Sequence, residues 1–151
     1  MNKSATIVIA FLAWMPLAFA GSGSRVVLHP KGKPAVTVKD EVVASPLERE
    51  RGLMFRKSMP KMDGMLFLFP NQSHLAFWMR NTLLPLDIIF ITAAKKVLGV
   101  AARATPMTDD PREVPGDSQF VLEVNGGFAA QHGIVEGTPV DFVNTPKIPS
   151  E

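Results

Sequence analysis

The apolar segment Met65-Leu66-Phe67-Leu68-Phe69, closed by Pro70-Asn71, decides the fold class of this 151-residue chain. An uninterrupted apolar run of this length, ended by a turn signal, is typical of a strand covered on both faces. We therefore expect a central strand at residues 65–69. Shorter strand patterns surround it along the sequence. They are expected at residues 35–44, 74–79, 86–92, 96–103, 120–124 and 138–143.

Two short helices are expected between these strands. Ser45, Pro46 and Glu48 form a capping box with proline in the first helical position, and Gly52 is a stop signal, so the first helix covers residues 46–51. The second follows the turn at residues 125–127 and ends at Gly133. Seven short strands with two small helices predict a mainly β fold, a compact antiparallel β-sandwich or barrel, as a single domain over residues 35–143.

The two ends of the chain have a different composition. Residues 1–20 combine a charged start, an apolar stretch and the small-residue ending Ala18-Phe19-Ala20, which is typical of a cleaved secretory signal peptide. The alternative, a membrane anchor, is less favoured because the apolar stretch is shorter than the roughly 20 residues of a spanning helix. We expect a periplasmic or secreted protein with no membrane span after cleavage, a flexible leader at 21–34 and a disordered tail at 144–151.

Composition excludes several functions. The chain has no cysteine, which removes thiol catalysis, thiolate metal sites and a lipoprotein anchor. Its 16 basic and 14 acidic residues are spread along the chain without a run of five or more like charges, which argues against a nucleic-acid partner. Residues 104–118 contain three prolines and four acidic residues, and a polar loop of this length in a small domain is either mobile or functional.

A family resemblance rests on several separate motifs in one order. They are Arg51-Gly52-Leu53-Met54-Phe55-Arg56, residues 64–67, Phe77-Trp78-Met79-Arg80-Asn81-Thr82, residues 85–90 and residues 121–124. Together with glycines at 126, 127, 133 and 137, they resemble the bacterial and archaeal family called domain of unknown function 192. The resemblance implies a compact β-rich fold, often behind a signal peptide, with no assigned reaction. One departure is Thr138, where the family more usually has aspartate.

Strand parity singles out charged residues in apolar surroundings. In the strand at 86–92, Asp87 shares a face with isoleucines, and Glu123 is placed beside Val121 in the same way. Arg80 shares a face with Trp78. A partly buried charge without a partner costs several kcal/mol, so these groups are expected to meet one another or a ligand.

The functional interpretation is a recessed pocket for a small polar ligand or a cell-envelope carbohydrate, without catalysis. Arginines would donate hydrogen bonds, carboxylates would accept them, and the tryptophan would give a flat stacking surface. The candidate ligand-binding residues are Arg51, Arg56, Trp78, Arg80, Asp87 and Glu123. The structural alternative is an ion-pair network of the same residues that fixes the first helix to the sheet.

Two further function classes stay open. A glycosidase-like hydrolase would use Asp87 and Glu123 as its carboxylate pair, although neighbouring arginines would lower both pKa values. A copper protein would use Met59, Met62 and Met65 as soft ligands, although core packing explains methionines as well. The histidines lack the spacing of a zinc site, and the acidic residues of 104–118 fit no calcium-loop signature, so we expect no metal and no cofactor.

Overall fold

The computed structural model describes residues 23–148 as seven strands and two short helices. Their bounds in chain order are β1 Arg25–Leu28, β2 Val36–Val43, α1 Pro46–Arg51, β3 Asp63–Ser73, β4 Leu86–Ile91, β5 Val97–Ala104, β6 Ser118–Asn125, α2 Phe128–His132 and β7 Val140–Val143. The mainly β fold class expected from the sequence is confirmed.

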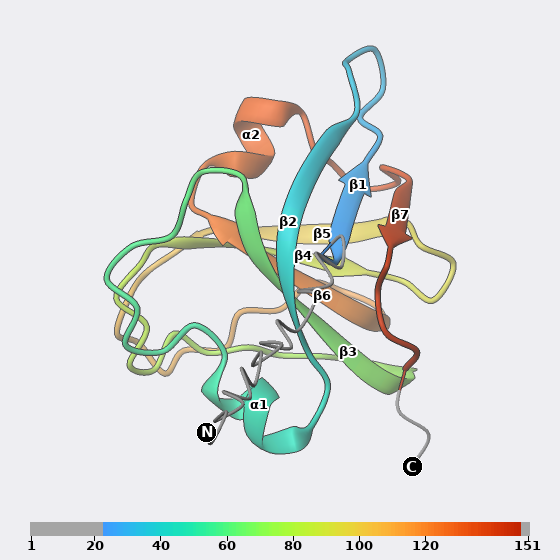
Figure 1. Cartoon of the computed structure of the whole chain (residues 1–151). Helices are drawn as coiled ribbons and strands as arrows, with labels where there is room; N and C mark the ends of the chain where they lie inside the picture. The colour runs from blue at the N-terminus through green and yellow to red at the C-terminus, as the bar shows by residue number, and fades with distance from the viewer. Residues whose placement is uncertain (1–22, 149–151) are drawn as a thin grey trace, which may run out of the picture.

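All seven strands belong to one sheet, in the order β5-β4-β6-β3-β2-β1-β7. Every neighbouring pair is antiparallel except β2 and β3, which run parallel because α1 and the loop after it carry the chain back. The sheet curls so that β1, β2 and β7 cross in front of β4 and β5 (Figure 1). A bridge between Lys96 and Pro139 joins the two ends of the sheet, and this gives the molecule a barrel-like shape.

The curled sheet buries apolar side chains on both faces, because most positions of its central strands β3, β4 and β6 are apolar. One core cluster contains Leu66, Ile89 and Leu122, and α2 adds Phe128 and Ala129 to it. The second core cluster contains the alternate residues of the same strands, among them Phe67, Ile88 and Val121. Helix α1 lies on the same face of the sheet as this second cluster. The two helices therefore cover different parts of the sheet and lie at opposite ends of the molecule in Figure 1.

Six of the seven expected strands are present, and α1 begins at the expected capping box. The remaining expected strand, at residues 74–79, is wrong. Residues 74–79 form only an isolated bridge between Phe77 and Arg112, because their large side chains cover the sheet instead of extending it. The missing strand is β1, which lies inside the segment expected to be a flexible leader. Its Val26 and Leu28 are fully buried, so apolar burial orders this segment.

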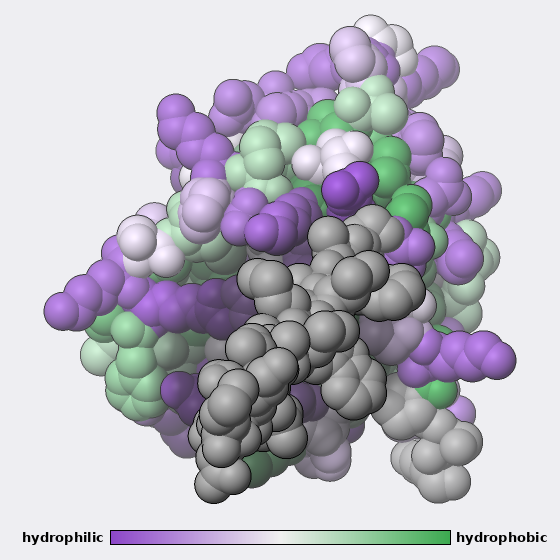
Figure 2. Space-filling model, in the orientation of Figure 1, coloured by the Kyte–Doolittle hydropathy of each residue, from purple (hydrophilic) through white to green (hydrophobic). Residues whose placement is uncertain are grey.

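The ends of the described chain also contact the body. In the segment expected to be a disordered tail, the Thr145 hydroxyl lies 3.0 Å from that of Ser24, and Ile148 packs against the first core cluster. The expected signal peptide, residues 1–20, lies outside the described residues. Within residues 23–148 no helix has the length and apolar character to cross a membrane. Hydrophilic residues occupy most of the face shown in Figure 2, with small apolar areas between them.

Candidate ligand pocket at helix α1

A pocket of about 260 Å³ lies between α1, the centre of the sheet and the segment 76–82, and we call it the α1 pocket. Its volume lies just below the roughly 300–1,000 Å³ found for small-molecule sites. Most of its wall is apolar and aromatic. The residues that line it are Arg49, Glu50, Arg51, Gly52, Leu53, Met54, Phe67, Phe69, Ala76, Phe77, Trp78, Thr82 and Glu123.

Helix α1 forms one rim of the pocket although it buries no side chain of its own. The Ser45 hydroxyl accepts from the Glu48 amide, and the Glu48 carboxylate accepts from the Ser45 amide, which fixes the start of the helix. The Arg49 guanidinium donates to the carbonyl oxygens of Ala44 and Leu68, the latter at 3.0 Å, and lies 4.8 Å from the centre of the Phe69 ring. Arg49 therefore ties α1 to β3.

Glu123 is the buried polar group of the pocket. It comes from β6, pairs across the sheet with Met65 and Ile88, and is only 5% exposed. No residue in the described part of the chain makes a hydrogen bond or ion pair with its carboxyl group. Burial raises the pKa of Glu123 from 4.5 to about 8. At neutral pH the pocket therefore contains a mostly uncharged carboxylic acid.

Aromatic rings surround this acid. Phe77 meets Phe67 edge to face, with ring centres 5.0 Å apart, and meets Phe69 at 6.3 Å. Such arrangements are favourable beyond the area that they bury, so these walls are well defined. Trp78 lies at the rim and is 40% exposed. The Arg80 guanidinium covers its ring at 4.2 Å, as the shared face of these two residues predicts.

The structure brings three of the six predicted site residues to the pocket, namely Arg51, Trp78 and Glu123. Two of the others form surface ion pairs. Arg56 donates two hydrogen bonds of 2.6 Å to Glu41 of β2, and Arg80 donates to Asp109 at 2.9 Å. These pairs are separate from each other, so the predicted network of arginines around the two carboxylates does not form.

Asp87, the sixth predicted residue, has a structural role. Its carboxylate is fully buried and accepts hydrogen bonds from the amides of Arg103, Gly127 and Ala129, at 2.8, 2.9 and 2.8 Å. The N-cap of α2 is Gly127, which has no side chain to cap the helix. Asp87 supplies this cap from β4 and so fixes α2 to the sheet.

The carboxylate pair of the hydrolase hypothesis is divided by the sheet. Asp87 pairs with Val124 and Ile88 pairs with Glu123 across β4 and β6, so the two acids point to opposite faces. A glycosidic bond cannot lie between groups on opposite faces of one sheet, and we do not carry this hypothesis further.

The three methionines of the copper hypothesis lie in different surroundings. Met65 is buried in the second core cluster, whereas Met59 and Met62 line two separate surface hollows. Within residues 23–148, no three His, Asp or Glu side chains are grouped so that they could hold a metal ion. The arrangement gives no common site for a soft metal.

Sequence reasoning missed Arg49 and the phenylalanine walls. The alternation of β3 does place Phe67 and Phe69 on the face of Met65, so their shared side could be found from parity. The segment 76–82 covers only part of this face, and its position cannot be found from parity. Arg49 is found only from its contact with Leu68, which is 19 residues away.

Comparison with known proteins agrees with this architecture. Residues 26–142 match the family DUF192, described as "Uncharacterized ACR, COG1430". The chain belongs to the DUF192 family. The resemblance seen in the sequence motifs is therefore confirmed, and the match covers every strand but the outermost residues of β1 and β7.

Two solved structures are similar to this DUF192 chain. A protein of unknown function from Novosphingobium aromaticivorans is 37% identical, with a TM-score of 0.75 over 78% of this chain and 83% of that one. A protein from Sinorhizobium meliloti, described as a candidate transcription regulator, is 30% identical, with a TM-score of 0.76 over 79% of this chain and 92% of that one. No curated protein matches the chain.

Proposed function

We propose that this DUF192 protein binds a small organic ligand in the α1 pocket and does not transform it. One observation carries the proposal: the Glu123 carboxyl lines a pocket of about 260 Å³ while lacking any partner among residues 23–148. A buried polar group without a partner costs free energy, and such groups are retained where they serve a ligand or a reaction. A ligand that bonds to Glu123 removes this cost.

The pocket walls favour an amphipathic ligand over a carbohydrate. A sugar needs many hydrogen bonds, but the inner walls are formed by Leu53 and the phenylalanines, and one face of Trp78 is already covered by Arg80. A ligand with an apolar body and one polar group that reaches Glu123 matches the lining better. Its small volume also limits the ligand to a size below that of most drugs.

We also propose that binding takes place outside the cytoplasm, as a periplasmic or secreted function. This proposal rests on the signal-peptide pattern of residues 1–20. It is tested by expressing the full chain in a bacterial host and separating periplasm, medium and cytoplasm. Accumulation of uncleaved protein in the cytoplasm would contradict it.

Ligand binding is tested by screening small amphipathic molecules with the purified protein. A ligand that binds only the folded state raises the melting temperature, and hits are mapped by amide chemical shifts. We expect the shifts to concentrate at α1, Phe77 and Glu123. Hits confined to other surfaces would contradict the assignment of the pocket.

Two variants separate pocket binding from surface binding. Ala76 is an exposed residue at the pocket rim, so Ala76→Phe should fold normally and block entry. The matched control is Ala102→Phe in β5, also exposed and outside the pocket lining. We expect the first substitution to weaken binding by at least about tenfold and the second to leave it unchanged. Equal affinity of both variants would refute the proposal.

A further inference from the structure

We infer that the ligand of the α1 pocket is an organic ammonium, whose cationic nitrogen pairs with Glu123 and whose apolar body lies against Phe67, Phe69 and Phe77. The inference rests on the proposed ligand-binding function and adds the chemical class of the ligand. It follows from three features of the pocket: an acid that lacks its cation, walls that favour a cation, and a rim whose charges lie in solvent or are bonded to the backbone.

The first feature is the missing counter-charge. Two surface carboxylates have an arginine partner, Glu41 with Arg56 and Asp109 with Arg80. Glu123 has none among residues 23–148, although it is the most buried acid on this face of the sheet. A ligand that carries the cation completes the pair, and the burial of Glu123 strengthens their attraction.

The second feature is the aromatic wall. The faces of phenylalanine and tryptophan rings carry partial negative charge and attract cations, most strongly where water is excluded. Phe67, Phe69, Phe77 and Trp78 all line the pocket around Glu123. Aromatic rings around one carboxylate make a recurrent setting for ammonium groups. A ligand carboxylate would instead meet the electron-rich faces of these rings.

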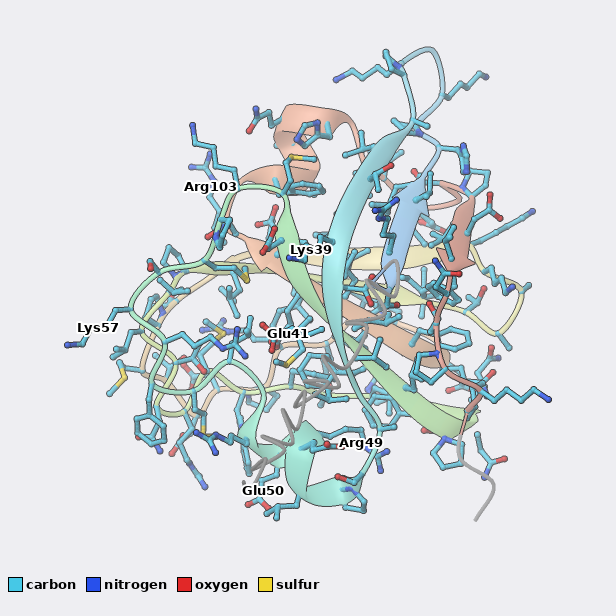
Figure 3. The ribbon with its side chains drawn as sticks, in the orientation of Figure 1. Lys39, Glu41, Arg49, Glu50, Lys57 and Arg103 are labelled. Atoms are coloured by element: carbon cyan, nitrogen blue, oxygen red, sulfur yellow. The ribbon has the colours of Figure 1, made fainter. Side chains whose placement is uncertain are left out.

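The third feature is the charge at the rim. The charged groups that face the pocket are Arg49, Glu50 and Arg51 of α1 and Glu123 of β6, while β3 and the segment 76–82 contribute uncharged linings. Arg49 is directed to the carbonyls of Ala44 and Leu68, and Figure 3 shows that it and Glu50 project from α1 on different sides. Glu50 and Arg51 are exposed neighbours of opposite charge, and solvent screens both. Among the residues that line the pocket, Glu123 is therefore the one ionisable group that is buried.

Binding of an ammonium changes the protonation of the acid. Before binding, Glu123 is mostly protonated at pH 7 because burial raises its pKa to about 8. Pairing with R–NH₃⁺ stabilises the carboxylate, so the O–H bond of the acid breaks and one proton passes to solvent. Below pH 8 the affinity for an ammonium should therefore rise by about tenfold per pH unit and then level off.

The test uses three probes of similar size, namely phenethylammonium, 2-phenylethanol and 3-phenylpropionate, titrated calorimetrically at pH 8. We expect the ammonium to bind at least about tenfold more tightly than the alcohol, and the carboxylate to bind most weakly. Glu123→Gln keeps the shape of the neutral acid but cannot become an anion. It should lower the affinity for the ammonium by at least about tenfold and leave that for the alcohol within about twofold.

Other outcomes overturn the inference in separable ways. If the alcohol or the carboxylate binds as tightly as the ammonium, or if Glu123→Gln retains the ammonium, the ligand class is wrong while the pocket function stands. If no probe binds, the ammonium class is also rejected. The proposed ligand-binding function is then tested separately, by comparing Ala76→Phe with Ala102→Phe for the ligands found in the screen. Wild-type protein gives a measurement that needs no variant to fold: affinity for phenethylammonium that is constant from pH 6 to pH 8 would reject the pairing with Glu123.

Discussion

At the scale of single residues, the two buried acids of the sheet centre show how one residue type serves two purposes. Asp87 and Glu123 lie on adjacent strands, yet Asp87 accepts three backbone hydrogen bonds and Glu123 accepts none within the described chain. The difference comes from the amides that face them. The start of α2 offers free N–H groups to Asp87, whereas Glu123 faces aromatic rings and the α1 pocket.

Replacing Asp87 with alanine should destabilise the fold. The substitution leaves the buried amide of Ala129 and the partly buried amides of Arg103 and Gly127 without this acceptor, and we expect a loss of about 2–4 kcal/mol in the free energy of unfolding. Urea denaturation measures it. The matched control is Asp109→Ala, which removes an exposed ion pair and should cost no more than about 1 kcal/mol. Equal losses for both variants would contradict the capping role of Asp87.

Glu123 should make the stability of the protein depend on pH. Its pKa is about 8 in the folded chain against 4.5 for the ordinary group, so the folded state holds the proton more tightly. The stabilisation is complete below pH 4.5 and is lost as the pH rises toward 8, by about 1.4 kcal/mol per pH unit.

The difference in unfolding free energy between wild type and Glu123→Gln isolates this contribution from all other titrations. We expect the glutamine variant to gain on the wild type as pH rises from 5 to 8, and to be the more stable protein at pH 9. A difference that stays constant over this range would show that Glu123 is not desolvated. Thermal or urea unfolding at several pH values gives the measurement.

At the scale of elements, α1 is a helix of six residues that buries none of them. Isolated helices of this length are not stable, so the capping box and outside contacts hold it. Arg49 provides the contact with β3 through the Leu68 carbonyl and the Phe69 ring. The rim of the α1 pocket therefore depends on one side chain.

Arg49→Met should loosen α1 while the sheet persists. Methionine keeps the length of the side chain but loses the hydrogen bonds to Ala44 and Leu68, which contribute about 1–3 kcal/mol in total. We expect faster amide hydrogen exchange in Pro46–Arg51 with little change in the core strands. Arg51→Met is the control, because Arg51 is exposed and makes no such contact with β3. Similar exchange in both variants would show that α1 is held in another way.

At the scale of the whole molecule, backbone hydrogen bonds join the two outermost strands of the sheet, β5 and β7, at one end. The Val97 amide donates to the Thr138 carbonyl and the Val140 amide donates to the Lys95 carbonyl, both at 2.9 Å. These bonds connect the β5 end of the sheet to the β7 end. An edge that is paired in this way is protected from association with other chains.

Closure of the sheet predicts slow exchange at its seam. We expect the amides of Val97 and Val140 to exchange only by global unfolding, with protection within about 1 kcal/mol of the free energy of unfolding. The Lys95 amide, which bonds to Thr92 in the hairpin turn, is the reference for local opening. If Val97 and Val140 exchange as fast as Lys95, the sheet is open at this seam in solution.

The sequence by itself determined the mainly β fold, both helices, six of the seven strands and the residues of the same strand that share a face with each central acid. These features are local: alternation, apolar runs and a capping box act over a few residues, so the pattern is visible without the partners. Strand β1 was hidden because it is only four residues long and lies between glycine and proline signals that are typical of loops.

Only the tertiary structure decided which charged residues meet. Arg56 pairs with Glu41, Arg80 pairs with Asp109, and Asp87 accepts from amides at the start of α2. Each of these partners is at least 15 positions away in the sequence. The α1 pocket, with Glu123 left unpaired, arises because the segment 76–82 covers part of the sheet and leaves the rest open. Burial and pairing are set by what packs against a face, and that depends on segments distant in the sequence.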